Sequence, residues 1–555
     1  MAANSLTNVP KPQNEQDSTV LRRSANYLPN QWDYNFIRTV ANNYTEAAYG
    51  SLAKELKEEV RALFSETDPL TLVRLIDSVE RLGVGYHFKE EIKQMLNDML
   101  ISGYHRVVQK DGLHATAVFF RLLRQHGFMI SEDMFNHFKD DDGSFMASLS
   151  GDIEGLLSLY QASYISFEGE NTLDAARAFT TVHLNLLDAS KSSFAGEIAY
   201  AMDLPSHWRP PRLEARRYID VYEKEGSMNS TLLWFAKLDF NMVQNIHQRE
   251  LEKVMSWWMT LGLGKKLGFA RDRTLECFFG VTIIVFQPQF GFCREWLPKI
   301  GALLVLLDDV YDVYGSLAEL ELFTDAIDRW EVKELESLPE CMKICFTTIG
   351  NVIDEMAHDI QKHSRLDILP YLRKAWTDLC KAFLVEARWQ NNKYVPTLAE
   401  YIDNGWMSVS GPLILFHTFF LLRQEPTKEA LEHLQNCPKV IRLASMIFRL
   451  CNDLATSTAE QERGDAPTSI HSYMKERGVS EIVARENISS IISETWKELN
   501  QECVLCTSFP PSFFDACANL ARMALCLYQH RDGFGIPTYE TKGRIISLLI
   551  KPITL

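Results

Sequence analysis

The stretch LLVLLDDVYDVYG, residues 303–315, joins an apolar run to three aspartates. Asp308 and Asp312 are four residues apart, so on a helix both project from one face, while Asp309 points aside. Two carboxylates on one face repel each other unless a cation lies between them. Mg²⁺ prefers such oxygen ligands and commonly shares them with a substrate phosphate. The stretch therefore predicts a helix that ends in a metal site, with a solvated helix end as the simpler interpretation.

A second set of oxygen donors lies in FRLCNDLATSTAE, residues 448–460. Asn452, Thr456 and Glu460 recur every four residues and form one stripe along one helix. Helix capping or exposure to solvent would explain each residue alone. Two stripes of hard oxygen ligands together predict a metal site between two helices.

Three arginines suit a diphosphate, because a planar guanidinium pairs with two oxygens at once. Arg449 lies one turn before Asn452 on the same helix. Arg271 and Arg273, in FARDRTLECFF, flank an aspartate where an apolar helix begins. One arginine there would be an ordinary surface residue, whereas the pair favours a phosphate clamp.

Apolar and aromatic residues fill the helices between these polar motifs, and each is first of all a candidate for core packing. Phe279, Phe448 and Tyr528 are also candidates for the wall of a cavity. An aromatic cavity beside a metal and phosphate rim suits ionisation of a prenyl diphosphate, because aromatic faces attract a carbocation and exclude water. Tyr528 is a candidate for the final base, a role that the released diphosphate could fill equally well.

The fold class follows from length and periodicity. A chain of 555 residues exceeds what one core normally organises, so we expect two domains. Residues 49–64, 69–83, 88–101, 114–126 and 153–168 have apolar residues at helical spacing, and strand alternation is nowhere sustained. The sequence therefore predicts an all-α protein of two helical domains.

Prolines and composition suggest where the domains divide. Residues 1–20 are polar and predict a flexible arm. The closely spaced prolines of residues 204–211 interrupt helix. We place an N-terminal helical domain at residues 21–229 and a C-terminal catalytic domain at 230–555, where further prolines, Pro298 among them, are expected to separate the helices.

Charge and targeting signals narrow the class of protein. The chain has 57 basic and 73 acidic residues, and its net charge of −16 argues against a nucleic-acid binder. Apolar runs such as residues 413–422 are much shorter than the ~18 residues that a membrane span needs. Residues 1–20 lack a signal-peptide core and the arginine bias of a transit peptide, which favours the cytoplasm, or the plastid if a targeting segment has been removed. The 11 cysteines suggest no disulfide framework.

These motifs resemble those of the plant terpene synthases over nearly the whole chain. DDVYD at 308–312 and NDLATSTAE at 452–460 stand in that family's order and spacing. Arg22 and Arg23, followed by eight residues and Trp32, match its tandem-arginine motif. The tandem-arginine motif and the residues around it are most similar to those of the angiosperm subfamily of cyclic monoterpene, isoprene, ocimene and α-farnesene synthases.

The resemblance implies an N-terminal helical barrel without catalysis and a C-terminal class I domain with three Mg²⁺ ions, which Mn²⁺ can replace. Asp308 and Asp312 would ligate two ions, Asp309 would support them without ligation, and the stripe at 452–460 would hold the third. The three arginines would receive the departing diphosphate, and the tandem arginines with Trp32 would cover the mouth of the site. The DxDD motif of class II cyclases is absent from the N-terminal half.

Several departures from the family pattern bear on substrate size. Many members have tryptophan where Gly280 stands, and limonene-type synthases have asparagine and histidine in place of Gly301 and Phe534. Isoprene synthases narrow the cavity with two phenylalanines, of which this chain keeps Phe448, and Val409 stands at another of their marked positions. Glycine in place of a large side chain enlarges a close-packed cavity. We therefore expect farnesyl diphosphate as the preferred substrate, with geranyl diphosphate possible as well.

Three alternatives remain open. The tandem arginines favour a monoterpene synthase that makes an acyclic product or a linalool-type alcohol from geranyl diphosphate. A chain-elongating prenyltransferase is disfavoured, because its second motif would also be rich in aspartate. A non-catalytic isoprenoid-binding helical protein is the remote alternative. We expect a monomer whose partner is the prenyl diphosphate.

Overall fold

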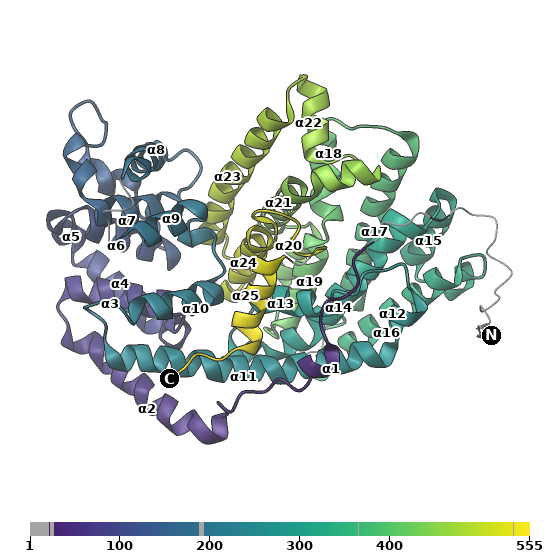
Figure 1. Cartoon of the computed structure of the whole chain (residues 1–555), viewed down its shortest axis with the longest axis horizontal. Helices are drawn as coiled ribbons and strands as arrows, with labels where there is room; N and C mark the ends of the chain where they lie inside the picture. Colours follow the sequence, from purple (N-terminus) through teal and green to yellow (C-terminus); the bar gives the residue numbers. More distant parts are fainter. Residues whose placement is uncertain (1–21, 23–26, 188–193, 364–365, 537) are drawn as a thin grey trace, which may run out of the picture.

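Helices joined by short loops make up the computed structural model (Figure 1). It describes residues 22, 27–187, 194–363, 366–536 and 538–555. Within these ranges the β pairing is limited to a single bridge between Lys139 and Phe145. The prediction of an all-α fold is confirmed.

The first part of the chain forms a compact group of short helices, drawn in purple and blue in Figure 1. Its α-helices are α1 (Tyr34–Ile37), α2 (Glu46–Glu66), α3 (Pro69–Arg81), α4 (Lys89–Ile101), α5 (His105–Asp111), α6 (Leu113–Gln125), α7 (Ile153–Ser163), α8 (Asn171–Leu186), α9 (Ala195–Asp203) and α10 (Pro211–Tyr222). Short helical turns are η1 (Gly85–His87), η2 (Glu132–Phe138), η3 (Ala147–Gly151) and η5 (Ser206–Trp208).

The second part contains the longer helices. Its α-helices are α11 (Ser230–Leu261), α12 (Leu263–Lys266), α13 (Thr274–Ile284), α14 (Gly291–Asp309), α15 (Leu317–Arg329), α16 (Glu340–Gln361), α17 (Leu369–Asn392), α18 (Leu398–Ser408), α19 (Gly411–Leu421), α20 (Lys428–Gln435), α21 (Lys439–Arg463), α22 (Ser469–Arg477), α23 (Glu481–Leu505), α24 (Pro511–Tyr528) and α25 (Tyr539–Ile545). The turns η6 (Pro288–Phe290), η7 (Val310–Tyr314), η8 (Val332–Leu335) and η9 (Ile546–Ile550) complete it.

Helix α11 joins the two parts. The Asn229 side chain caps it by accepting a hydrogen bond from the Leu232 amide at 2.9 Å. The helix then packs against α2 and α10 of the first part and against α13 and α14 of the second. Figure 1 shows it running along the base of the molecule. It begins at Ser230, where the sequence placed the domain boundary, and the division into domains itself stays a prediction.

One proline behaves differently from the prediction. Pro298 was expected to separate helices, but it lies inside α14. Proline within a helix forgoes one backbone hydrogen bond and strains the preceding turn. Helix α14 is held by packing against α11, α13, α16 and α19, and Pro298 is itself buried. Tertiary packing therefore outweighs the local preference at this position.

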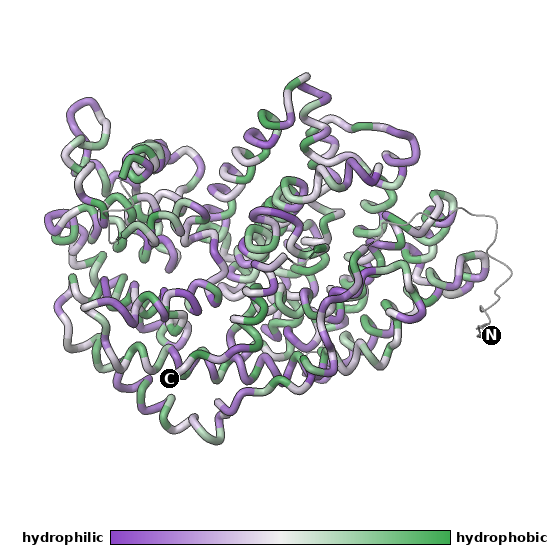
Figure 2. Tube along the Cα trace, in the orientation of Figure 1, coloured by the Kyte–Doolittle hydropathy of each residue, from purple (hydrophilic) through white to green (hydrophobic). Residues whose placement is uncertain are grey.

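The core of the second part is built around α13 and α19. Every residue of α13 is buried, and in α19 only Ile414 is not. Figure 2 shows apolar residues gathered in the helices at the centre of this part. Helices α14, α21 and α24 pack around these two. The predicted polar motifs stand at the start of α13, at the end of α14 and along α21, so the core positions all three.

Two negative expectations can be compared with the structure. Across the described ranges, no helix combines the length and apolar character needed to cross a membrane. The 11 cysteines are all free thiols, and most of them are buried. No disulfide therefore contributes to the fold of the described residues.

Candidate active site

The aspartate motif lies where α14 changes pitch. Asp308 and Asp309 are the last residues of α14, and Asp312 lies in the π-helical turn η7 that follows. The sequence predicted one regular helical face, whereas the structure presents Asp312 from a wider turn. Asp312 is exposed at this helix end. Partial desolvation raises its pKa well above the usual range, and the nearby Asp308 carboxylate adds to the shift.

Asp309 meets Arg271. Its carboxylate is fully buried and accepts hydrogen bonds from the Arg271 amide at 2.6 Å and from Nε at 2.9 Å. Burial raises the pKa of Asp309, and the Arg271 guanidinium acts against this rise. Nη2 of Arg271 reaches the Asp308 carboxylate. Asp309 therefore orients an arginine beside Asp308.

The second predicted stripe is continuous on α21. The Thr456 hydroxyl donates to the backbone carbonyl of Asn452 at 3.0 Å. Burial and the neighbouring Asp453 raise the pKa of Glu460 to about 7. Asn452, Thr456 and Glu460 follow one another every four residues within α21, and their role as ligands stays a prediction.

Acidic groups from three other segments of the chain act on Asp312: Asp308, Glu386 and Asp465. Glu386 of α17 and Asp465, which follows α21, both raise the pKa of Asp312. Burial raises the pKa of Glu386 as well. Such mutual repulsion would be relieved by a divalent cation, and the donors are the hard oxygens that Mg²⁺ takes. No group of three or more His, Cys, Asp or Glu side chains among the described residues would hold an ion alone, so the amide, the hydroxyl and a substrate phosphate would have to complete its ligands.

The Arg449 side chain is half-buried. Its Nε donates to the Gly405 carbonyl at 3.0 Å and Nη2 to the Ser408 hydroxyl at 2.9 Å. Glu386 and Asp453 lie 3.5 and 3.6 Å from its terminal nitrogens. These contacts fix the guanidinium between α18 and α21, on the side of α21 that carries the oxygen stripe.

Tyr528, the last residue of α24, links the two motifs. Its ring stacks on Phe448 at a centroid distance of 6.2 Å. Burial raises the pKa of its hydroxyl, Asp308 contributes to the rise, and a hydrogen bond with Asn452 lowers it. The phenol is therefore neutral and lies close to both metal-ligand candidates. Of the other wall candidates, Phe279 and Val409 are buried and Phe534 is half-buried.

The two glycines expected to enlarge a cavity face other side chains. A Cβ at Gly280 would lie 3.0 Å from Met523 Sδ, and a Cβ at Gly301 would lie 3.2 Å from Cys277 Cβ. Met523 and Cys277 thus occupy the space next to each glycine. Each glycine therefore has a neighbouring side chain in contact distance of a Cβ, and the expectation that the two glycines leave room for a longer substrate stays a prediction.

The residues expected to cover the site do contact its surroundings. Arg22 binds Glu319 at 2.6 and 2.9 Å, donates to the Tyr314 carbonyl at 3.1 Å and lies over the Tyr314 ring. The Trp32 indole donates to Glu276 of α13 at 2.8 Å. Arg23 lies outside the described residues. Arg22 and Trp32 therefore attach the start of the chain to η7, α15 and α13.

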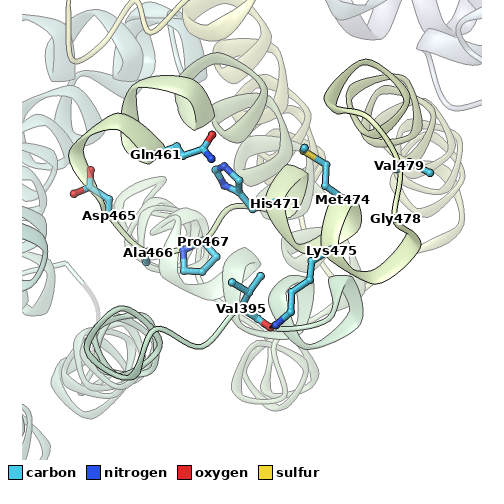
Figure 3. A pocket seen from close by; sticks show the side chains of 10 residues that line it. All are labelled: Val395, Gln461, Asp465, Ala466, Pro467, His471, Met474, Lys475, Gly478 and Val479. Carbon is cyan, nitrogen blue, oxygen red and sulfur yellow. The ribbon is translucent and has the colours of Figure 1, made fainter.

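A pocket of about 450 Å³ lies next to the site but apart from its predicted residues (Figure 3). It opens between the end of α21 and α22, where Gln461, His471 and Lys475 contribute to its lining. Asp465 also lines it and is the one residue it shares with the acidic group around Asp312. The sequence patterns did not indicate this pocket.

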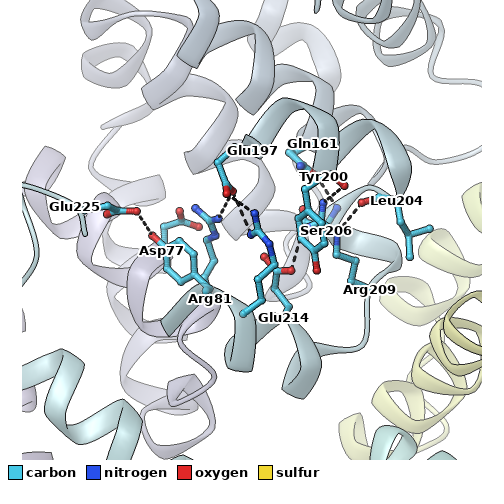
Figure 4. A network of polar contacts seen from close by, with 12 residues as sticks. Asp77, Arg81, Gln161, Glu197, Tyr200, Leu204, Ser206, Arg209, Glu214 and Glu225 are labelled. Carbon is cyan, nitrogen blue, oxygen red and sulfur yellow. Dashed lines mark hydrogen bonds and ion pairs between the residues drawn. The ribbon is translucent and has the colours of Figure 1, made fainter. Parts of the chain in front are cut away.

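Arginine and glutamate side chains in the first part form ion pairs with one another (Figure 4). Arg209 binds Glu214 at 2.9 Å, and Arg217 binds Glu197. Glu197 also lies 3.8 Å from Arg81. Arg81, Glu197, Arg209 and Glu214 border a cleft of about 1780 Å³ that reaches the second part of the molecule. Since each charge has an opposite partner, a structural role accounts for the network.

Comparison with known proteins now assigns the family. A model described as "Terpene synthase family, metal binding domain" matches residues 259–498, and one described as "Terpene synthase, N-terminal domain" matches residues 31–202. The chain belongs to the terpene synthase family. It is a class I terpene synthase, a lyase that acts on a prenyl diphosphate with a divalent metal cofactor.

Individual relatives cover nearly the whole chain. The chain is 49% identical to (-)-alpha-terpineol synthase of Vitis vinifera over 97% of its own length and 92% of the relative. It is 48% identical to the chloroplastic myrcene synthase of Quercus ilex, covering 97% and 90%. The crystal structure of isoprene synthase from grey poplar leaves (Populus x canescens), in complex with three Mg²⁺ ions and dimethylallyl-S-thiolodiphosphate, has a TM-score of 0.87 and 43% identity, covering 95% of this chain and 99% of that one.

These comparisons correct two predictions. The expectation of a cytoplasmic protein is wrong, because the myrcene synthase and further relatives are named as chloroplastic, which points to the plastid. That expectation depended on the composition of residues 1–20 alone. The preference for farnesyl diphosphate is not supported either, since α-terpineol synthase and myrcene synthase are monoterpene synthases.

Several contributing residues escaped the sequence analysis. Glu386 lies in a helix with charged residues on several faces, and nothing in its spacing separates it from them. Asp272 was noted between the two arginines but not as the partner of Tyr34, which donates to it at 2.5 Å. Tyr27, whose ring lies under Arg271 at 4.4 Å, is far away in sequence. Such long-range partners leave no periodic signal.

Proposed function

We propose that the protein is a monoterpene synthase that ionises geranyl diphosphate. The observation that carries the proposal is the identity of 49% and 48%, over nearly the whole chain, to α-terpineol and myrcene synthases. Met523 and Cys277 lie next to Gly280 and Gly301, so the two glycines alone are no argument for a fifteen-carbon substrate.

We assign Asp308 and Asp312 to one side of the metal site, and Asn452, Thr456 and Glu460 to the other. The oxygen chemistry of these groups and the acidic surroundings of Asp312 support the assignment. Mg²⁺, when bound, neutralises the diphosphate and makes it a better leaving group. The three Mg²⁺ ions in the poplar isoprene synthase structure support the same number for this chain.

Two arginines are placed to hold the diphosphate. Arg271 is oriented by Asp309 and already reaches the Asp308 carboxylate, so its guanidinium faces the place where phosphate oxygens would lie. Arg449 is fixed by Gly405 and Ser408 beside the oxygen stripe. Both side chains keep their positive charge at any physiological pH, which suits a leaving group that gains negative charge.

The aromatic wall would hold the carbocation. Phe448 and Tyr528 present stacked rings, whose faces attract a cation. Because burial keeps the Tyr528 hydroxyl neutral, it is a weak base, and the released diphosphate is the better acceptor of the final proton. Phe279, Val409 and Phe534 are assigned to the rest of the wall.

The remaining assignments concern the protein as a whole. We propose that it acts in the plastid as a monomer, that residues 21–229 form a non-catalytic helical domain and residues 230–555 the catalytic one, and that Arg22 and Trp32 belong to a cap over the site. The chloroplastic names of the relatives support the location. The contacts of Arg22 and Trp32 with η7 and α13 support the cap.

Steady-state kinetics with purified protein, Mg²⁺ and either geranyl or farnesyl diphosphate tests the proposal, with products identified by gas chromatography. We expect kcat/KM for geranyl diphosphate to be at least about tenfold higher than kcat/KM for farnesyl diphosphate. The reason is that each extra methylene in a closed cavity costs about 1–3 kcal/mol. Equal or higher kcat/KM with farnesyl diphosphate would overturn the proposed substrate.

A further inference from the structure

Arg273 was predicted to receive the diphosphate, yet its guanidinium faces the protein backbone. The residue is only 2% exposed. Nη2 donates to the Leu28 carbonyl at 3.0 Å and to the Gly535 carbonyl at 2.7 Å, and Nη1 donates to the Asp272 carbonyl at 2.9 Å. Nε is enclosed without a partner among the described residues. Turning this group towards a phosphate would break buried hydrogen bonds, which is costly.

The first segment that Arg273 holds is residues 27–34, which we call the strap and which Figure 1 shows in dark purple crossing the second part of the molecule. Two further hydrogen bonds tie the strap to the start of α13: Trp32 donates to Glu276, and Tyr34 donates to Asp272. The Arg271 guanidinium lies over the ring of Tyr27. The strap therefore passes directly beside the arginine that contacts the aspartate motif.

The second segment is residues 529–536, which follow α24 and which we call the exit loop. Its shape is set by Asp532, whose Oδ1 accepts hydrogen bonds from the amides of Phe534 and Gly535 at 3.1 and 2.7 Å. The loop begins directly after Tyr528, the aromatic residue near Asp308. A single nitrogen atom of Arg273 thus joins two segments that are more than 500 positions apart in the sequence.

We propose that Arg273 is a positioning residue that fastens the strap and the exit loop to each other beside the site, so that water is kept from the carbocation, while Arg271 meets the diphosphate. The inference rests on the proposed function, because excluding water matters only where a cation forms. A guanidinium suits this task, since its planar fork of donors can bind several carbonyls at once, which the compact ammonium of a lysine does less well.

Hydrogen exchange of the substrate-free protein tests the fastening without any turnover. Arg273→Met keeps most of the length of the side chain and removes all donors. We expect amide exchange in both the strap and the exit loop to become about tenfold faster, as the loss of a charge-assisted hydrogen bond predicts. Tyr34→Phe should speed exchange in the strap and leave the exit loop unchanged.

Inhibition by inorganic diphosphate with Mg²⁺ separates the two arginines. Arg271→Lys should weaken inhibition about tenfold, because a bidentate contact is lost. Arg273→Met should leave the inhibition constant within about twofold of the unaltered enzyme and should raise the fraction of alcohol among the products, as water reaches the cation. Arg273→Lys, which retains the charge, replaces Arg273→Met in every measurement if the latter does not fold.

Two results would overturn the inference. One is Arg273 variants that weaken inhibition by diphosphate as strongly as Arg271→Lys does. The other is exchange in the strap or in the exit loop that stays at the level of the unaltered protein. Failure of the unaltered enzyme to turn over any prenyl diphosphate would refute the proposed function instead, and the exchange measurements would still decide whether Arg273 fastens the two segments.

Discussion

Within DDVYD, neighbouring aspartates have different surroundings. Asp309 is fully buried against Arg271, whereas Asp312 is exposed and faces other carboxylates. Helical spacing alone predicted that Asp309 would point away from the other two. It could not predict that the buried carboxylate orients an arginine, because Arg271 is 38 positions away. At this scale, spacing identifies candidate ligands, and only the folded chain identifies their partners.

Gly280 offers a test of how the wall of the site is packed. Gly280→Ala places a Cβ 3.0 Å from Met523 Sδ, so Met523 must move. We expect a loss of about 1 kcal/mol in the free energy of unfolding and a changed product ratio, because overpacking shifts neighbouring side chains. Urea unfolding and product analysis measure both effects, and Gly280→Ala should cost less stability in a Met523→Ala background, where the Sδ atom that its Cβ would meet is absent.

Gly543→Ala is the matched control for this substitution. Gly543 lies in α25, and nothing lies within 4 Å of a Cβ at this position. Alanine there should leave the product ratio unchanged and should not destabilise the protein, because it favours helix over glycine. If Gly280→Ala behaves like Gly543→Ala, the space beside Gly280 is open and Met523 does not fill it.

Among the helices, those with clear periodicity could be predicted and the interruptions could not. Residues 69–83 and 88–101 agree with α3 and α4 to within two residues. Pro298 lies inside α14, and a π-helical turn follows Asp309. Both depend on packing against other helices, which cannot be predicted from the local sequence. The wider π-helical turn η7 sets the direction in which the Asp312 side chain leaves the helix.

The start of α15 connects η7 to the beginning of the chain. Glu319 accepts hydrogen bonds from the amide and the hydroxyl of Ser316, and it binds Arg22. We expect Glu319→Ala to lower the free energy of unfolding by about 1–2 kcal/mol, because it removes a cap and an ion pair together. Chemical denaturation measures the change.

The control for Glu319 is Glu400, which caps α18 in the same way through Thr397 but lies on the surface. Glu400→Ala should cost less stability than Glu319→Ala and should leave the affinity for substrate unchanged. Equal losses for the two variants would show that the contact with Arg22 contributes nothing.

Across the whole molecule, His207 lies where the two parts meet. Its Nε2 is 2.7 Å from Asn500 Oδ1, and its carbonyl accepts a hydrogen bond from Arg522. Burial lowers the pKa of His207 to about 3, and the positive charges of Arg522 and Arg121 contribute. In the unfolded chain the pKa is near 6.5, so between these values the unfolded state binds the extra proton.

Stability should therefore fall as pH decreases from about 6.5 towards 3, with a slope from this residue of up to about 1.4 kcal/mol per pH unit. Since other groups also titrate in this range, His207→Gln is the necessary comparison. Its stability should decline less steeply over the same interval, measured by denaturant unfolding at several pH values. Parallel curves for the two proteins would contradict the burial of a neutral imidazole at this junction.

The central claim is that Asp308 takes part in the metal-dependent departure of diphosphate, and Asp308→Ala tests it most directly. Release of inorganic diphosphate from geranyl diphosphate, measured with and without Mg²⁺, follows this step whatever the terpene product. We expect release by the unaltered enzyme to require Mg²⁺ and release by Asp308→Ala to fall by a factor of about 10²–10³, as for loss of a group that stabilises developing charge. Circular dichroism should show the variant folded. A folded Asp308→Ala protein with undiminished release would contradict the role of Asp308 in the metal site.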